Sequence, residues 1–423
     1  MTILTFSISI KDTKNLSRTS NAAMPDSSSE TVMQYQASNS ANQPRKRLWP
    51  FTLVLSTMVP VLAAVLVYQL DSFEPAPMPI HELGQTPMTV SLRNDRMLQG
   101  AEFVGAGKLQ GPEDIAYDPK SQLIYTGCQD GWIKRVRLND SAVENLVNTH
   151  GRPLGLALGH NDEVIVADAY KGLLNISRDG EVELLTDEAD GLKFKITDGV
   201  DIADNGMIYF TDASYKYDLH DHLWEILDGK PHGRFMSFDP VTRKTRVLVG
   251  DLYFANGVAV SPRQDSAIFC ETIMYVALVI ISKFNCRRRC RNYHIQANKQ
   301  GRLEKFLDNL PGYPDNIRYD GDGHYWIGLA AETSVTFELA FRYPFIRKAM
   351  AIMAKYIARL PNGKNAGILA VDLEGKPVAH YHDRELSAVT GGMKIGNLLY
   401  CGSLTSPHII SLNLDKHPAK AAA

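Results

Sequence analysis

A short pattern repeats six times along this chain, and it restricts the folds available more than any other feature of the sequence. Each copy has an apolar, β-rich run, a turn rich in Gly, Asp, Asn or Pro, and a second β-rich run. The first runs are EDIAYD (113–118), LGLAL (154–158), DGVDIA (198–203), NGVAVS (256–261), DNIRYD (315–320) and GGMKI (391–395). Because one small sheet cannot bury both of its faces alone, six such units predict an all-β fold, a six-bladed β-propeller over residues 100–415. A solenoid is the alternative, but no leucine-rich, ankyrin or tetratricopeptide spacing fits.

The repeat also places oxygen-bearing side chains in one column. We expect the first run of each unit to be the innermost strand of a blade, the strand that lines the central channel. Two places before the aligned apolar residue of each run stand Glu113, Leu154, Asp198, Asn256, Asp315 and Gly391. Four of these six carry the oxygen ligands that Ca²⁺ prefers, so the column predicts a calcium site in the channel. The alternative is that each acid or amide only caps a turn at a strand end.

The residue that follows each column position is small in most units, and Gly is the commonest choice. A residue without a side chain lets neighbouring backbones approach closely. We therefore expect the inner strands to pack tightly against one another at this level.

An uncharged run of 23 residues, 48–70, precedes the repeats. At about 1.5 Å per residue it is long enough to cross the roughly 30 Å hydrocarbon core of a bilayer. It is longer than the apolar part of a cleaved signal peptide and begins later, which favours an uncleaved signal anchor over a buried core helix. Residues 45–47 are Arg-Lys-Arg, and Asp71 and Glu74 follow the run, so the positive-inside rule leaves the tail cytosolic and the body lumenal or extracellular.

These patterns divide the chain into a disordered cytosolic tail (1–47), a transmembrane anchor (48–70), a Pro-rich stalk (71–99), the propeller (100–415) and a short C-terminal tail (416–423). We expect a single-pass type II membrane protein of the endomembrane system, in the endoplasmic reticulum, vacuole or plasma membrane. The N-glycosylation sequons at Asn139 and Asn175 would then face the lumen.

Composition excludes several classes of protein. Lys and Arg total 45 and Asp and Glu 47, so the net charge is 45 − 47 = −2, with no basic excess for binding nucleic acid. A hydrophobic content of 44% excludes a wholly disordered chain. Five Cys are too few for a disulfide-dense scaffold, and the odd number leaves at least one thiol free or paired elsewhere.

Several longer segments carry a resemblance to a known family: GRPLGLAL, IYFTDASYKYDL, HGRFMSFDP, LYFANGVAVSP and LPGYPDNIRYDGDGHYWIGLA. In this order they resemble the plant strictosidine synthase-like proteins and the animal adipocyte plasma membrane-associated proteins. The resemblance implies a six-bladed propeller related to paraoxonases and gluconolactonases, with a membrane signal anchor in several relatives. It also implies a channel Ca²⁺ held by the residues at the family's motif positions, here Glu113, Asp198, Asn256, Asp315 and Asn316. Position 198 carries Asp where relatives often have Asn, which keeps the oxygen and adds charge.

Two departures from the relatives bear on activity. Strictosidine synthases use a Glu shortly before their last repeat strand, whereas residues 387–397 here read SAVTGGMKIGN and contain no acid. Because that condensation needs a group to accept the ring proton, true strictosidine synthase activity is not expected. Paraoxonases use a His pair above the calcium, and the matching positions here fall at Leu154 and near Asp168.

The remaining interpretation is that the protein is a calcium-dependent, arylesterase-like hydrolase of esters or lactones. Its ligand would be small and apolar or alkaloid-like. Ca²⁺ would polarise the carbonyl and a carboxylate would activate water. Asp168 is our candidate for that base, and a turn-forming aspartate is the equal alternative. A second class of function stays open: a non-catalytic membrane-tethered propeller that binds a ligand or partner and holds a structural calcium.

Residues 341–361 lie between the fifth and sixth units and read as a basic amphipathic helix. Ile346, Met350, Met353 and Ile357 form one apolar stripe. We expect this helix to lie over the channel mouth, as a cap with solvated charges or as a helix on the membrane surface.

Residues 273–290, IMYVALVIISKFNCRRRC, lengthen the fourth unit between its second and third strands. The segment mixes an apolar β-branched run with a basic cluster and has no turn chemistry at either end. We favour a gene-model error such as retained intron sequence, in which case the blade should close without it. A membrane-dipping loop is the alternative.

Overall fold

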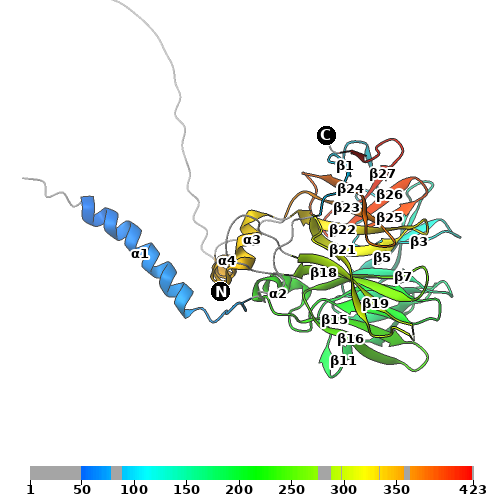
Figure 1. Cartoon of the computed structure of the whole chain (residues 1–423), viewed down its shortest axis with the longest axis horizontal. Helices are drawn as coiled ribbons and strands as arrows, with labels where there is room; N and C mark the ends of the chain where they lie inside the picture. Colours follow the sequence, from blue (N-terminus) through cyan, green and yellow to red (C-terminus); the bar gives the residue numbers. More distant parts are fainter. Residues whose placement is uncertain are drawn as a thin grey trace, which may run out of the picture. The chain divides into compact units, whose positions relative to one another are not determined.

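In the computed structural model the chain folds mostly into β-strands, and the structure describes residues 49–77, 88–274, 287–296, 298–332, 334–356 and 363–421. Six sheets form the blades of a β-propeller (Figure 1), which confirms the predicted fold class. Blade one contains β3 (Ala116–Asp118), β4 (Leu123–Gly127), β5 (Trp132–Arg137) and β6 (Val143–Asn148). Blade two contains β7 (Pro153–Leu158), β8 (Val164–Asp168), β9 (Gly172–Ile176) and β10 (Val182–Thr186). Blade three contains β13 (Thr197–Ile202), β14 (Ile208–Asp212), β15 (Gly233–Asp239) and β16 (Lys244–Leu252).

Blade four contains β17 (Ala255–Val260), β18 (Ser266–Met274), β19 (Arg287–His294) and β20 (Leu303–Asp308). Blade five contains β21 (Gly312–Tyr319), β22 (His324–Glu332), β23 (Ala366–Asp372) and β24 (Pro377–Asp383). Blade six contains β25 (Val389–Ile395), β26 (Leu398–Ser403), β27 (Ile409–Asn413) and β2 (Ala101–Val104). A small hairpin, β11 (Glu188–Ala189) and β12 (Leu192–Lys193), leads into blade three. The first strands of neighbouring blades contact one another around the axis, as expected of the innermost strands.

The ring is closed by a strand from the opposite end of the chain. β2 pairs antiparallel with β27 and so completes the sixth blade, with Glu102 opposite Ser411. Two further strands, β1 (Leu92–Asn94) and β28 (Lys420–Ala421), extend the fifth sheet beyond β24. The predicted stalk (71–99) and C-terminal tail (416–423) are therefore corrected: parts of both belong to the propeller, because β24 offers an unpaired edge that these strands cover.

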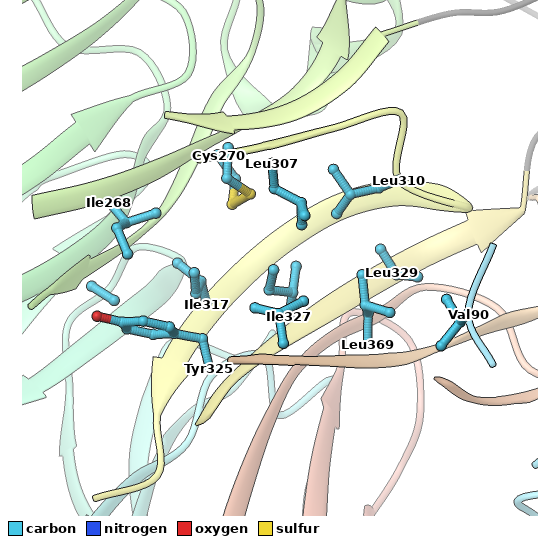
Figure 2. Close-up of a cluster of buried hydrophobic side chains, with 13 residues drawn as sticks. Val90, Ile268, Cys270, Leu307, Leu310, Ile317, Tyr325, Ile327, Leu329 and Leu369 are labelled. Carbon is cyan, nitrogen blue, oxygen red and sulfur yellow. A yellow bond between two sulfur atoms is a disulfide. The ribbon is translucent and has the colours of Figure 1, made fainter. Parts of the chain in front are cut away.

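The core lies in layers between adjacent blades. Figure 2 shows the layer between blades four and five, where Ile268 and Leu307 face Ile317 and Ile327. All four side chains are at most 3% exposed. Burying an aliphatic side chain of this size stabilises the fold by roughly 1.5–3 kcal/mol, so each interface between blades holds its two sheets together. Val90, from the segment predicted to be a stalk, reaches the end of the same layer.

Strand direction alternates within each blade, so the first strand begins on the face where the second strand ends. The connections from second to third strands open on that face, which we call the mouth face. Three helices formed by such connections gather there (Figure 1): α2 (His222–Asp228), α3 (Val335–Arg342) and α4 (Pro344–Tyr356). A 3₁₀ turn, Leu219–Asp221, precedes α2 and is capped by Asp218.

The helix predicted over 341–361 is two helices in the structure, and residues 357–362, including Ile357, lie outside the described residues. The break falls at Tyr343, which is extended (φ −120°, ψ 107°) because Pro344 follows it and disfavours a helical predecessor. Met350 is buried and Met353 is 47% exposed, so they do not share one buried stripe. The expectation of fully solvated charges is also wrong, since Arg347 is fully buried.

The apolar run predicted as an anchor forms α1 (Trp49–Leu70). Its segment Leu53–Leu70 has a mean hydropathy of 2.1 and no buried residue, so it is long and apolar enough to cross a membrane. Pro60 lies within the helix. A signal sequence would pass the same test of length and composition.

The lengthened fourth blade is closed by strand pairing on both sides of the predicted insertion, with a register shift between Glu271 and Met274. β18 and β19 pair antiparallel from Ser266–His294 to Met274–Arg287. Cys270 and Cys290, directly opposite each other, form a disulfide. Residues 275–286, which include most of the segment attributed to a gene-model error, lie outside the described residues.

Candidate functional site

The predicted column of side chains coincides with an irregularity shared by the inner strands. In five blades the pairing of first and second strands shifts register at the column, between Pro153 and Leu156, Thr197 and Val200, Ala255 and Val258, Pro314 and Ile317, and Val389 and Gly392. A register shift of this kind bends a strand and re-aims its side chains. Here it frees the column residues from the ladder and lets them converge at the channel.

Glycine next to the column lets the inner strands approach closely. A Cβ on Gly199 would lie 2.7 Å from the carbonyl oxygen of Asn256, and one on Gly257 would lie 2.4 Å from the Cα of Asn316. Real Cβ atoms do not come that close to backbone, so any side chain here would push two blades apart. The expectation drawn from the small residues is confirmed.

The column brings three carboxylates to one point. Glu113, Asp198 and Asp315 offer oxygen atoms that all lie within 4.8 Å of one another, and the three residues are 1%, 4% and 6% exposed. Asn256 hydrogen-bonds Asp315, and the Nδ2 of Asn316 donates to Glu113 Oε1 at 2.8 Å. The five residues predicted as calcium ligands are therefore neighbours in the structure, although they come from four blades.

The electrostatics of this carboxylate cluster are unfavourable without a cation. Burial, and then the charge of Asp315, raise the pKa of Glu113 well above its usual range, while Arg152 opposes the shift. The pKa values of Asp198 and Asp315 are also well above the usual range, first because of burial and then because of the neighbouring carboxylates. Buried like charges disfavour one another's ionised form, so a bound cation would favour the ionised carboxylates and oppose all three shifts.

Two oxygen atoms of the cluster have no hydrogen-bond donor in the described part of the chain. They are Glu113 Oε2 and Asn256 Oδ1, both fully buried. A buried acceptor without a partner is costly. Carboxylate and amide oxygens are the ligands that Ca²⁺ takes, so the residues present fit that ion.

In blade two the column position is occupied by Leu154, an apolar residue without a side-chain oxygen. Leu154 is 2% exposed and packs with Ile196, Phe254 and Leu404. Leu154 is the position that the resemblance to paraoxonases matches to a histidine. The position therefore carries no proton acceptor.

Further from the mouth face, an arginine that the sequence reasoning missed crosses the axis. Arg318 forms an ion pair with Asp114 of blade one, and its Nη1 donates to the carbonyl oxygen of Val200 in blade three at 3.2 Å. Asp114 also accepts from the backbone N–H of Leu156 at 2.9 Å. The repeat contained a signal: one place after the aligned apolar residue, three units carry Ala and the other three carry the charged residues Asp201, Arg318 and Lys394.

The carboxylate of Asp168, the predicted base, already accepts several hydrogen bonds from neighbouring groups of the protein. It is fully buried and accepts hydrogen bonds from Thr149 Oγ1 at 2.7 Å and from the backbone N–H groups of Arg152, Tyr170 and Lys171 at 3.0–3.1 Å. Both of its oxygens accept hydrogen bonds from neighbouring groups of the protein, so the carboxylate holds the chain in place around it. The structure favours the turn-forming alternative over the catalytic one.

The two sequons differ in their surroundings. Asn139 is exposed in the turn between β5 and β6. Asn175 lies within β9, opposite Glu183 of β10, and its Nδ2 is 3.4 Å from Glu183 Oε2. Only Asn139 has the exposed turn position typical of a modified asparagine.

Comparison with known proteins places the chain in a family. The strictosidine synthase family model matches residues 198–297, and that of the strictosidine synthase-like N-terminal region matches residues 93–136. Proteins STRICTOSIDINE SYNTHASE-LIKE 6 and 4 of Arabidopsis thaliana are each 55% identical to this chain, over 87% of it and over 96% and 97% of their own lengths. The chain belongs to the strictosidine synthase-like family.

More distant strictosidine synthase-like relatives occur in animals. The adipocyte plasma membrane-associated protein of Gallus gallus is 28% identical over 86% of this chain and 89% of its own length. The resemblance stated from sequence motifs is thus confirmed for both the plant and the animal proteins.

Solved structures support the fold. A gluconolactonase from Xanthomonas campestris superposes with a TM-score of 0.53 at 14% identity, covering 80% of this chain and 98% of its own. Regucalcin, a calcium-binding protein from Agrobacterium tumefaciens, superposes with a TM-score of 0.50 at 14% identity, covering 77% and 95%. At this identity the likeness concerns the propeller architecture alone.

Proposed function

We propose that this strictosidine synthase-like protein binds Ca²⁺ in its channel and hydrolyses a small apolar ester or lactone at that site. The observation that carries the proposal is the buried cluster of Glu113, Asp198 and Asp315. Asn256 and Asn316 complete an oxygen set from neighbouring blades. The calcium-binding and gluconolactonase propellers with the same architecture add support from chains of low identity.

A bound divalent cation supplies Lewis acidity, which polarises a carbonyl or phosphoryl oxygen. The chain's own residues contribute the rest. The carboxylate cluster would hold and neutralise the ion, while Leu154 and Phe254 would contact the apolar part of a ligand and exclude water. Residues 387–397 contain no acid, so the proposal does not include a strictosidine synthase reaction.

A panel of aryl esters and lactones, assayed with Ca²⁺ and with EDTA, tests the activity. We expect turnover that EDTA abolishes and Ca²⁺ restores. The matched variants are Asp315→Asn, which removes a cluster charge, and Asp322→Asn, which removes an exposed aspartate of the same blade. Activity that survives both EDTA and Asp315→Asn would contradict the proposal.

A second function, ligand binding without catalysis around a structural calcium, is favoured by one observation. The carboxylate expected to serve as the base, Asp168, has its oxygens bonded to its own turn and to the segment before β7. The same panel separates the two: calcium-dependent stabilisation with no turnover of any ester or lactone supports the binding role.

We also propose that α1 anchors the protein with its body in the lumen or outside the cell, in the endomembrane system. The Cys270–Cys290 disulfide supports this side of the membrane, because disulfides persist in oxidising compartments. Glycosidase treatment of the native protein should shift its mobility by one glycan. Asn139→Gln should remove that shift and Asn175→Gln should keep it, while an unshifted native protein would argue against the lumenal side.

A further inference from the structure

Helix α4 has two apolar faces, and only one of them is covered. Met350 and Ala351 face inward, 7% and 1% exposed, and pack with Leu227 of α2. On the opposite side, Phe345 and Met353 are 59% and 47% exposed. A soluble cap would present polar residues there.

The exposed side is one continuous stripe. Phe345, Met353 and Tyr356 are exposed, and Ala349 and Ile352, which lie between them at helical spacing, are half-buried. Tyr356 is 62% exposed. A contiguous exposed apolar surface marks a site of contact with a partner or a membrane.

The segment that leaves the apolar helix α1 is fastened to this same helix. Lys355 pairs with Asp71 at 3.2 Å, and Lys348 pairs with Glu74 at 2.5 Å. The guanidinium of Arg347, fully buried, donates to the carbonyl oxygen of Ala76.

Two aromatic contacts continue this attachment. The ammonium of Lys348 lies 5.0 Å from the ring centre of Tyr68, in the last turns of α1. Phe73 packs edge-on against Trp224 of α2, with ring centres 5.3 Å apart. The residues directly after the apolar helix therefore do not form a free stalk, and they hold α4 at the point where the chain would emerge from a membrane.

We infer that the outer stripe of α4 docks into the headgroup region of the same bilayer that α1 crosses. An interfacial helix has this character: an apolar face toward the acyl chains and cations at its border, here Lys355. The two acidic residues that directly follow α1, Asp71 and Glu74, each form an ion pair with a lysine of α4, which lowers their electrostatic repulsion from an anionic lipid surface. The inference rests on the proposed anchor and is independent of the proposed hydrolysis.

The docking fixes which side of the propeller meets the lipid. Helices α2 to α4 cover the mouth face, and the inner strands that carry the carboxylate cluster begin on that face. The channel would thus open toward the membrane surface, so an apolar ligand dissolved in the bilayer could reach it without crossing bulk water.

Photocrosslinking of the full chain in phosphatidylcholine liposomes tests this contact. The photoreactive amino acid p-benzoylphenylalanine replaces Phe345 or Met353 in separate proteins, and tritiated phosphatidylcholine is the probe. We expect labelled lipid on both. The matched control is Val241, which is 90% exposed in the β15–β16 turn on the opposite face and should take no label. Unchanged thermal melting shows that each substituted protein is folded.

A position inside α1 separates failure of the inference from failure of the anchor. p-Benzoylphenylalanine at Leu62 should crosslink lipid if α1 spans the bilayer. Label at 62 without label at 345 and 353 would overturn the docking and leave the anchor intact, whereas no label at 62 would overturn both. Crosslinks from 345 or 353 to a second copy of the chain, in place of lipid, would also overturn the docking.

Discussion

Two sets of buried acidic residues lie one strand apart on the blades, and the groups that surround their carboxylates differ. The inner set lies at the channel: Glu113, Asp198 and Asp315. The outer set lies on the second strands, with Asp168 and Asp212 at the strand ends and Glu271 three residues before the end of β18. All six side chains are at most 6% exposed, so burial alone does not distinguish them.

The outer acids are surrounded by donors. Each accepts from a backbone N–H in the segment leading into its own blade's first strand: Arg152 for Asp168, Ile196 for Asp212 and Tyr253 for Glu271. Asp212 and Glu271 also pair with the buried guanidinium groups of Arg234 and Arg289.

The inner acids face one another instead, and Glu113 Oε2 lacks any donor in the described part of the chain. The difference shows that position in the repeat, and not residue type, decides what an acid does in this fold. Outer acids stabilise a blade by accepting hydrogen bonds within it, whereas inner acids need a bound cation to balance their charges. Four predictions test that division.

The largest effect is expected from Asp212→Ala. Removing one partner of the buried pair leaves the Arg234 guanidinium without its counter-charge, which costs about 3–5 kcal/mol of unfolding free energy. Thermal or urea unfolding should show this loss equally with Ca²⁺ and with EDTA. A loss that Ca²⁺ reverses would place Asp212 with the inner set.

Asp168→Ala should cost somewhat less, about 3 kcal/mol, because it leaves backbone N–H groups and Thr149 without their acceptor but strands no charge. The midpoint of a calcium titration, followed by melting temperature, should not move. If calcium binding weakens in this variant, the outer acids do not form a separate set and the comparison fails.

For the inner set the sign of the effect should depend on calcium. Asp315→Asn removes a buried charge whose pKa is raised by burial and by Asp198, so in EDTA the variant should be at least as stable as the native protein. With Ca²⁺ at about 100 times its dissociation constant, the native protein gains about 2.7 kcal/mol and the variant should lose most of that gain. Leu154→Ala, at the same level without an oxygen, should lower stability but keep the calcium response. An Asp315→Asn protein that is less stable in EDTA would contradict the account of repulsion.

Much of this arrangement could be predicted from sequence because the fold is a repeat. Aligning six units puts Asp198, Asn256 and Asp315 at one level without any knowledge of distance. The blades and the inner position of the first strands follow from the same alignment. The order of small and apolar residues is set by packing around a shared axis, and that packing is identical in kind for every unit.

What could not be predicted lies outside the repeat or depends on long-range partners. The pairing of β1 and β28 with the fifth sheet joins residues 92–94 to 420–421, which no local pattern signals. Asp168 looks the same in sequence whether it is a free base or a bonded one, because two of its donors, Thr149 and Arg152, lie 19 and 16 residues earlier in the chain. The buried charges of α4 are satisfied by the segment after α1 and by carbonyl oxygens of α2, so the expectation of solvated charges, drawn from helical periodicity alone, was wrong.

The smallest effect is expected from Asn256→Ala. This variant tests whether calcium binding by the inner set depends on carboxylate charge or only on the number of oxygen ligands. Asn256 Oδ1 is buried without a donor and would give an ion a neutral ligand, so its loss removes one oxygen but leaves all three carboxylates. Calcium affinity should fall about tenfold, equivalent to about 1.4 kcal/mol, which is less than for Asp315→Asn. Calcium titrations of the two variants, read by melting temperature, compare them directly. If Asn256→Ala weakens binding as much as Asp315→Asn does, the ion depends on a complete shell of oxygens and the repulsion among the acids is not what recruits it. If it has no effect, Asn256 stands with the outer acids as a turn residue, and the inner set contracts to the carboxylates alone.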